Sequence, residues 1–244
     1  MAPVYNESLG IESLLREWLA YLEDFADKNP GFSFEICLAD DKSTDGTREI
    51  IRDFAEEDGR VLVFCHEVNF GAGRALSTAI NGARGKYCLV MDSDGQFPIN
   101  NLESLWGYRG ESTAVVGNRV QKHDHVVNRL GSQASNFFFQ TLIGSGIRDS
   151  NCALKLLPTD EFRAFPIRGN RMVYSGEHSY ICLSANFAIE NVDIVQVPRK
   201  FGFSSTKIVK DGVARLLFTS FLAFESRLVK NKIINVKSPW GKYS

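Results

Sequence analysis

The sequence contains no uninterrupted apolar run that approaches the roughly 20 residues needed to cross a bilayer. The best stretch, Leu216 to Phe224, is too short and lies between Arg215 and Glu225. The start also lacks the pattern of a signal peptide, because Met1 is followed at once by Ala-Pro-Val-Tyr-Asn-Glu. We therefore expect a cytoplasmic protein without a transmembrane helix.

Cysteine is scarce and carries no recognisable pattern. There are five cysteines, an odd number, and no CxxC occurs among them. Three lie inside apolar runs, namely EICLA, VLVFCH and YCLVM. This usage favours reduced core residues in a cytosolic protein over disulfides or zinc ligands.

The chain also lacks an excess of charge of one sign. Its 28 basic and 29 acidic residues give a net charge of -1, and a general nucleic-acid binder is usually more basic. The balance hides an asymmetry, because residues 1–60 carry 6 basic and 15 acidic side chains whereas residues 199–244 carry 10 basic and 2 acidic. A basic end can meet phosphates or an anionic membrane surface, and a solvated helix face explains it equally well.

Helical and strand patterns alternate along the 244 residues without repeats, which indicates one α/β domain. Strands are expected at 34–39, 61–65, 87–91, 114–117 and 192–197. Helices are expected at 9–28, with Ser8 as its cap, and at 44–57, 71–84, 128–142, 179–188 and 208–230. Only Met1 and Ala2 precede Pro3, so the first strand is predicted to be clipped or very short: either the chain begins late or the sheet tolerates a stub in a central position.

The last helix, 208–230, has its apolar residues on one face. They are spaced by three or four: Val209, Val213, Leu217, Phe221, Phe224 and Leu228. A helix docked on its own domain is slightly favoured, and an amphipathic helix at a membrane surface is the functional alternative. We accordingly divide the chain into a domain at 1–206 and a basic amphipathic helix and tail at 207–244.

The strongest local signal is Asp92-Ser93-Asp94-Gly95-Gln96, which follows an apolar strand. Ligands of open α/β sheets bind outside the carboxyl ends of the strands. Two carboxylates there suit Mg²⁺ or Mn²⁺ bridging substrate phosphates, and Gln96 offers a third oxygen. An isolated Asp-x-Asp is weak evidence for a metal site, since both Asp and Gly are common in loops.

Two further loops fall where a strand meets a helix. In the DDKSTDGT run, Asp40 can accept from a nucleobase N–H or a ribose hydroxyl, while Thr44 or Asp45 can cap the helix. Asn69 to Arg74 resembles a phosphate-cradling turn, but it lacks the Lys-Ser/Thr of a P-loop and the third Gly of the dinucleotide fingerprint.

In order and spacing, these runs resemble the nucleotide-sugar half of glycosyltransferase family 2. The matching runs are PVYNE at 3–7, DDKSTDGT, NFGAGRALSTAINGARGKY and DSDGQFP. The later motifs look most like the polyprenyl-phosphate, or dolichyl-phosphate mannose synthase-like, sugar transferases; they are GNR at 117–119, NRLGS at 128–132, RDSNCA at 148–153 and VPRKFGFSSTK at 197–207. The resemblance implies a GT-A (Rossmann-like) fold with a mixed, mostly parallel sheet flanked by helices.

The resemblance also implies roles for particular positions. Metal binding falls to Asp92 and Asp94, joined by Gln96 as in the DxDxQ subgroup. Nucleotide-sugar binding falls to Pro3, Tyr5, Glu7, Asp40, Arg74, Asp92, Ser93 and Asp94. The resemblance assigns the catalytic contacts to Arg119, Arg129, Lys207 and Asp149. These contacts include those to the donor diphosphate and to the acceptor phosphate.

The implied reaction is inverting transfer of a sugar from a nucleoside-diphosphate sugar to a dolichyl or undecaprenyl phosphate at the inner membrane surface. An acceptor phosphate is already ionised and needs no strong base, whereas the leaving diphosphate needs a divalent cation and arginines. Two alternatives stay open: a saccharide acceptor, with Asp149 or Glu177 as base, and a non-catalytic nucleotide-sugar binding module. The chain departs from the family at two positions where a Gly is usual. Lys42 stands after the paired aspartates, and Ala153 stands after the Asp149 loop.

Overall fold

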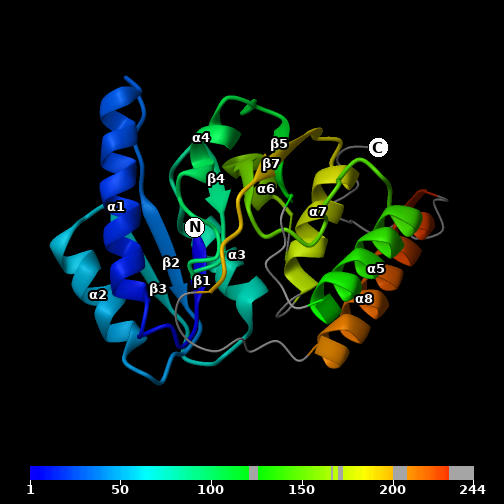
Figure 1. Ribbon diagram of the computed structural model, residues 1–244, viewed down its shortest axis with the longest axis horizontal. Coiled ribbons are helices and arrows are strands. Elements are labelled where there is room, and N and C mark those ends of the chain that lie inside the picture. Colours follow the sequence, from blue (N-terminus) through cyan, green and yellow to red (C-terminus); the bar gives the residue numbers. More distant parts are fainter. Residues whose placement is uncertain (121–125, 166, 170–172, 200–207, 231–244) are drawn as a thin grey trace.

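The structure, a computed structural model, describes residues 1–120, 126–165, 167–169, 173–199 and 208–230, with side chains described except at 126–130, 208–211 and 228–230. Its strands are β1 Ala2–Val4, β2 Ile36–Asp40, β3 Val61–Cys65, β4 Tyr87–Val90, β5 Thr113–Arg119, β6 Lys155–Pro158 and β7 Ala188–Ile194. Its helices are α1 Ile11–Lys28, α2 Thr47–Glu57, α3 Ala72–Gly82, α4 Asn101–Trp106, α5 Val126–Leu142, α6 Thr159–Arg163, α7 Tyr174–Ser184 and α8 Ile208–Lys230. Figure 1 shows their arrangement.

The strands form two ladders that meet at Met1. One ladder has the order β1-β2-β3 and is parallel, and the other has the order β4-β6-β5-β7. The Met1 amine donates to the Leu89 carbonyl at 2.6 Å and the Met91 amide donates to the Met1 carbonyl at 3.1 Å, so β1 lies beside β4. Only β6 runs antiparallel to its neighbours in these ladders. The predicted mixed, mostly parallel sheet is confirmed.

The first strand is as short as the sequence indicates. β1 has three residues, all buried, and it lies between β2 and β4 in the middle of the sheet. Successive side chains of a strand point to opposite faces. In β2, Leu38 therefore joins the main core with Leu15 and Trp18 of α1, whereas Cys37 and Ala39 pack in a second cluster with small residues of α3.

Helices cover both faces of this sheet. Phe25 of α1 packs edge-on against Trp106 of α4 at 6.2 Å between ring centroids, which ties the two helices over one face. α3 lies against β1 and β2, and its alanines allow the close approach. α5 and α8 lie side by side at the far end of the molecule from α1 and α2 (Figure 1).

The sequence missed some local detail. β6, α4 and α6 were not predicted, and α7 begins at Tyr174, five residues before the expected start. The prediction that Ser8 caps α1 is wrong, because the helix begins after Gly10 without a side-chain cap. The Ser8 amide instead donates to Oδ2 of Asp45 at 3.1 Å, which ties the segment to a neighbouring loop.

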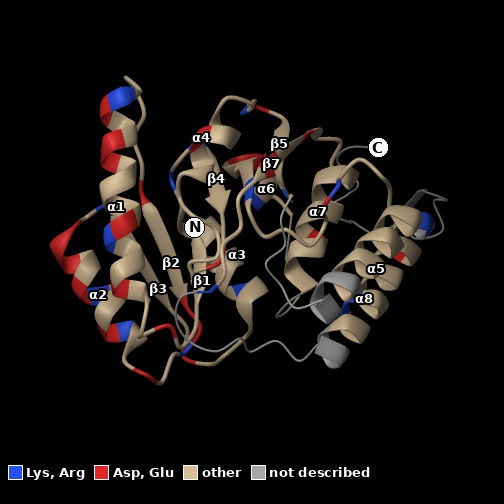
Figure 2. Cartoon of the chain, in the orientation of Figure 1, with Lys and Arg blue, Asp and Glu red and all other residues tan. Residues whose placement is uncertain are grey.

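α8 docks through a different face from the one expected. Thr219, Leu222 and Ala223 are buried, and Leu222 packs in a small cluster with Phe139 of α5 and Tyr180 of α7. The predicted apolar face is exposed instead, at Val213, Leu217, Phe221 and Phe224. Figure 2 shows more acidic residues on α1 and α2 than on the described parts of α5 and α8. Among the described residues, no helix combines the length and apolarity required to cross a membrane.

All five cysteines are free thiols, and four are buried. Burial raises the pKa of Cys37, Cys88 and Cys152 to about 11 each, so these thiols stay protonated at neutral pH. The expectation of reduced core cysteines is confirmed.

Candidate active site

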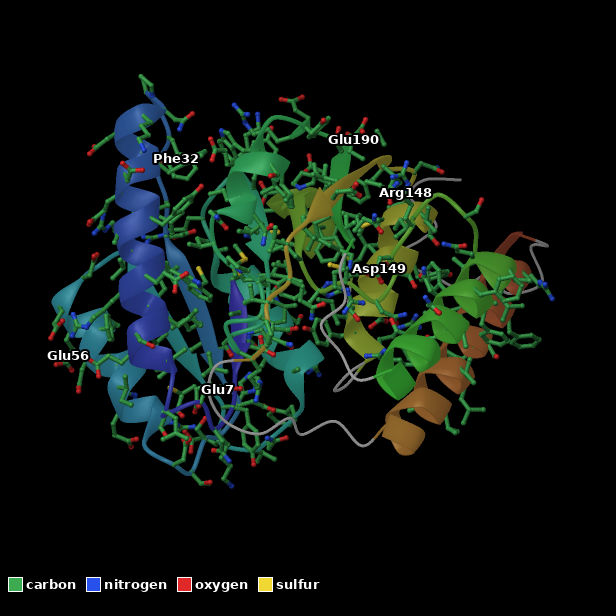
Figure 3. All side chains as sticks on the ribbon, viewed as in Figure 1. Glu7, Phe32, Glu56, Arg148, Asp149 and Glu190 are labelled. Carbon is green, nitrogen blue, oxygen red and sulfur yellow. The ribbon has the colours of Figure 1, made fainter. Side chains whose placement is uncertain are left out.

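Acidic side chains meet where β2, β1 and β4 end. These neighbouring strands are parallel, so their carboxyl ends share one edge of the sheet. Asp40 ends β2, Glu7 follows β1, and Asp92 follows β4. Figure 3 shows Glu7 near this edge and Asp149 in the half that carries α5 and α7.

The loop after β1 is tied to the loop after β2. Oδ1 of Asn6 accepts the Thr44 amide at 2.8 Å, and the Glu7 amide donates to Oγ1 of Thr47 at 2.9 Å. The expected cap by Thr44 or Asp45 is wrong, because the N-cap residue of α2 is Gly46 and the helix has no side-chain cap, although Oδ1 of Asp45 accepts the Thr47 amide at 3.1 Å. Lys42 stands here with φ of 63°, a left-handed conformation that explains why glycine suits this position better.

The paired aspartates after β2 serve the fold as well as the site. Asp40 is fully buried; Nε of Arg48 donates to it at 2.7 Å and the Ser43 amide at 3.2 Å. Asp41 accepts from the amides of Phe70 at 2.9 Å and Gly71 at 2.6 Å. Asp41 thereby anchors the glycine turn before α3, a role that the sequence did not reveal.

The acidic turn after β4 holds its two carboxylates close together. Burial, and then the charge of Asp94, raises the pKa of Asp92 to about 6. The hydroxyl of Tyr174 donates to Oδ1 of Asp92, and the Gln96 amide donates to Oδ1 of Asp94 at 3.0 Å. Tyr174 is a site residue that sequence reasoning missed, because it reaches this turn from α7.

This oxygen set fits a divalent cation. Two neighbouring carboxylates gain from a cation between them, since the charge of Asp94 already raises the pKa of Asp92, and Mg²⁺ and Mn²⁺ take oxygen ligands. No group of three or more potential ligands occurs among the described residues. That is expected where one or two carboxylates share the ion with water and substrate phosphates. Ser93 between them donates to the Pro3 carbonyl at 2.7 Å, fixing the turn to β1.

Glu7 completes the acidic cluster. Its pKa is raised to about 7, because burial outweighs the opposing charge of Arg199 and the charge of Asp94 adds to the rise. Nη2 of Arg199 lies 3.0 Å from Oε1 of Glu7 and 3.3 Å from Oδ2 of Asp94. The sequence motif containing Arg199 was noted, but this contact was not predicted.

The other half of the site contributes a buried ion pair. Nε of Arg119 lies 2.8 Å from Oδ2 of Asp149, and Nη2 lies 3.1 Å from Oδ1. The charge of Arg119 lowers the pKa of Asp92, so the pair lies within electrostatic reach of the acidic turn. The structure thus pairs Arg119 with Asp149, and the charge of Arg119 acts on Asp92.

Three other predicted site residues have side chains that make none of the contacts described above. Tyr5 is half-exposed beside the β1 edge, and Arg74 is exposed in the first turn of α3. Gln96 is partly buried on the acidic turn. The Arg129 side chain and Lys207 lie outside the described residues.

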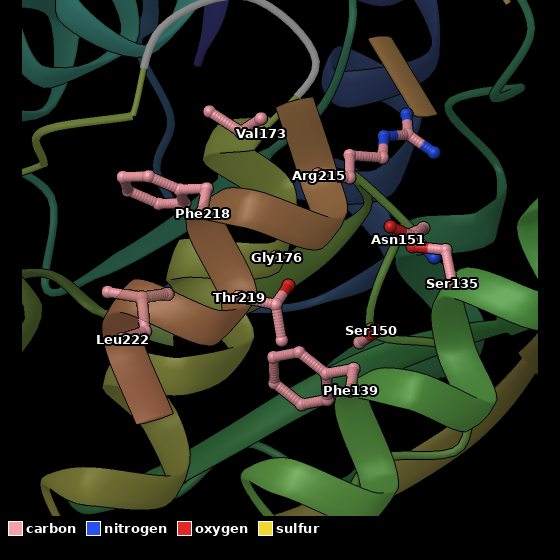
Figure 4. A pocket seen from close by; sticks show the side chains of 10 residues that line it. All are labelled: Ser135, Phe139, Ser150, Asn151, Val173, Gly176, Arg215, Phe218, Thr219 and Leu222. Carbon is pink, nitrogen blue, oxygen red and sulfur yellow. The ribbon is translucent and has the colours of Figure 1, made fainter. Parts of the chain in front are cut away.

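A small pocket opens beside Asp149, between α5, α7 and α8 (Figure 4). One wall is polar, with Ser135, Ser150 and Asn151, and the opposite wall is apolar, with Phe218 and Leu222. It adjoins the Arg119–Asp149 pair rather than the acidic edge, because Ser150 follows Asp149 directly.

Glu177, a possible base from the sequence, is already engaged. It is fully buried and accepts from the amides of Arg168 at 2.8 Å and Gly169 at 2.6 Å, and from Nε of Arg168 at 3.2 Å. Its neighbour His178 is also fully buried, between the rings of Phe162 and Tyr174. Both residues lie near the start of α7.

The strand order and the acidic turn at the sheet edge are those of a GT-A α/β fold. Among solved structures, a glucosyl-3-phosphoglycerate synthase from Mycobacterium tuberculosis aligns with a TM-score of 0.66 and 19% identity, covering 89% of this chain and 77% of the other. Residues 1–174 match the family described as Glycosyl transferase family 2. The chain belongs to this family, and it is a glycosyltransferase by that membership.

Relatives by sequence fall in the same family. A dolichyl-phosphate beta-glucosyltransferase from Dictyostelium discoideum is 27% identical over 245 residues, which cover 91% of this chain and 74% of the relative. An undecaprenyl-phosphate 4-deoxy-4-formamido-L-arabinose transferase from Edwardsiella ictaluri is 29% identical over 196 residues, covering 79% of this chain and 57% of the relative. The chain therefore spans between about a third and three quarters of the length of the curated relatives that it matches.

Proposed function

We propose that this glycosyltransferase moves a sugar, with inversion, from a nucleoside-diphosphate sugar to a polyprenyl phosphate at the inner face of a membrane. The observation that carries the proposal is the proximity of two parts of the site, the acidic turn and the Arg119–Asp149 pair. The acidic turn at Asp92 and Asp94 suits a donor diphosphate, and the Arg119–Asp149 pair lies within electrostatic reach of it. The names of the sequence relatives indicate polyprenyl-phosphate acceptors.

The donor half is assigned to the edge of the sheet. Pro3, Tyr5, Glu7, Asp40, Arg74 and Ser93 are proposed to line the nucleotide-sugar site. Asp92, Asp94 and Gln96 would hold Mg²⁺ or Mn²⁺, which neutralises charge on the departing diphosphate. Support comes from the likeness in fold to a synthase whose solved complex contains Mn²⁺ and UDP-glucose.

The acceptor half needs cations more than a base. The phosphate oxygen of the acceptor bonds to the anomeric carbon while the bond from that carbon to the donor diphosphate breaks. Arg119, Arg129 and Lys207 are proposed to hold the two phosphate groups, with Asp149 fixing the direction of the Arg119 guanidinium. Glu177 accepts three hydrogen bonds and Asp149 is paired, which disfavours a saccharide acceptor that needs one of them as base.

The exposed face of α8 supports attachment at a membrane surface. Val213, Leu217, Phe221 and Phe224 lie exposed on this helix, and the sequence around it is strongly basic. Apolar side chains beside basic residues suit an anionic lipid surface. The full chain should co-sediment with phosphatidylglycerol vesicles, and Phe221→Ser/Phe224→Ser should weaken this, whereas Leu9→Ser, an exposed apolar residue before α1, should not.

A transfer assay tests the proposed reaction. The full chain is incubated with Mg²⁺, radiolabelled nucleotide sugars and either undecaprenyl or dolichyl phosphate, and the lipid extract is counted. Label in the lipid for at least one donor supports the acceptor. Unlabelled lipid across the common donors, with label in saccharides instead, contradicts it; donor binding without any turnover would indicate a non-catalytic module.

A further inference from the structure

A guanidinium occupies the acidic edge of the sheet. Nη2 of Arg199 bridges Oε1 of Glu7 at 3.0 Å and Oδ2 of Asp94 at 3.3 Å. The Arg199 side chain is only 22% exposed, and the two carboxylates are 13% and 12% exposed. Just before Arg199, the Val197 amide donates to the Gln96 carbonyl at 2.9 Å, which fixes this segment beside the acidic turn.

This contact lies where a metal ion would need an oxygen. Oδ1 of Asp94 accepts the Gln96 amide, and Oδ2 faces Arg199. A divalent ion arriving alone would have to share Oδ2 with the guanidinium at close range, and like charges repel strongly in a partly buried site. The metal and the unmoved guanidinium are therefore competitors for Asp94.

A diphosphate removes that conflict. It brings negative oxygens on which a guanidinium can form charge-assisted hydrogen bonds of the same kind that it makes to carboxylates. Arg199 can then leave Asp94 without becoming an unpaired buried charge, which is the costly state.

We propose that Arg199 couples the binding of the divalent cation to that of the nucleoside diphosphate, holding Asp94 and Glu7 in the empty site and turning to the diphosphate when both ligands bind. The inference rests on the proposed donor site and goes beyond it. Each ligand then raises the affinity of the other by the same factor, as linkage requires. A cation without nucleotide binds weakly.

Mn²⁺ binding to the full chain tests this directly. Free Mn²⁺ is followed by its electron paramagnetic resonance signal in titrations with and without UDP or GDP, corrected for Mn²⁺ bound by the nucleotide alone. Arg199→Gln should bind Mn²⁺ alone about tenfold or more tightly than the wild type, bind the nucleotide less tightly at saturating Mn²⁺, and lose most of the coupling. Arg199→Lys keeps the charge and should retain part of the coupling.

Arg16→Gln is the matched control, because it removes one positive charge from an exposed pair with Glu12 on α1. It should leave both affinities unchanged. Equal or weaker binding of Mn²⁺ alone by folded Arg199→Gln overturns the role of Arg199 and leaves the donor site standing. A wild type that binds no Mn²⁺ with either nucleotide overturns the donor site itself.

Discussion

Arg119 of β5 and Asp149, 30 residues later, form a bidentate ion pair with distances of 2.8 and 3.1 Å. Both side chains are nearly buried, with exposures of 11% and 2%. Removing one partner of such a pair is costly, because the buried charge that remains loses compensation. The pair is therefore expected to stabilise this region, in addition to the proposed contact of Arg119 with a phosphate group.

Arg119→Met should destabilise the fold by about 3–5 kcal/mol, because Asp149 loses a buried partner that donates to both of its oxygens. Urea unfolding measures the change. The double variant Arg119→Met/Asp149→Leu should recover much of the loss while remaining inactive. An unfolding free energy of Arg119→Met equal to that of the wild type would show that the pair is not needed for stability.

Tyr174→Phe should weaken the metal site without disturbing the fold. Tyr174 donates to Asp92, and partners that orient a metal ligand typically change metal affinity by about 10- to 100-fold. The measurement is Mn²⁺-dependent nucleotide binding by calorimetry. Tyr108→Phe, at an exposed tyrosine, serves as control. Unchanged Mn²⁺ dependence in Tyr174→Phe would remove the positioning role of this hydroxyl.

Asp94→Asn should lower turnover by about 100-fold or more, since it removes a negative oxygen from the proposed cation site. The melting temperature should stay close to that of the wild type. Asp53→Asn, an exposed acid on α2, controls for the loss of one charge. Wild-type rates in Asp94→Asn would refute the metal assignment.

His178 should make the fold sensitive to acid. Burial, and then the charge of Lys155, lowers its pKa well below 6.5, so the folded protein keeps it neutral. The unfolded chain takes up a proton below about pH 6.5, and stability therefore falls as the pH drops, by at most about 1.4 kcal/mol per pH unit.

His178→Leu should remove this contribution, and its two ring nitrogens have no partner to lose among the described side chains. Urea unfolding at pH 7.5 and pH 5.5 measures it. The variant should lose less stability than the wild type between these values. Identical losses in the two proteins would mean that His178 does not report on acid unfolding.

Two glycines offer a matched test of packing. A Cβ on Gly73 would lie 1.8 Å from the Gly169 carbonyl oxygen, whereas a Cβ on Gly176 meets nothing within 4 Å. Gly73→Ala should cost about 1–3 kcal/mol through overpacking, and Gly176→Ala in α7 should gain up to about 1 kcal/mol in helix propensity. Thermal unfolding of both variants checks this; equal shifts would contradict the close approach at Gly73.

Local patterns determined most of the elements. The bounds of β3 and α8 agree with the periodicity, and the three consecutive phenylalanines divide as a helix requires, with Phe137 exposed and Phe139 buried. β6 was missed because Lys155–Pro158 is a short run whose strand character comes from pairing with β4 and β5. The docked face of α8 was wrong because apolar spacing does not say which side meets the domain.

By itself the sequence determined that carboxylates follow the strands, since that order lies along the chain. Only the tertiary structure decided which side chains meet. Arg199 reaches Glu7 across 192 residues and Tyr174 reaches Asp92 across 82. Such partners depend on the order of the strands in the sheet and on the path of the connecting segments. Those are set by packing across the whole core, and no local spacing encodes them.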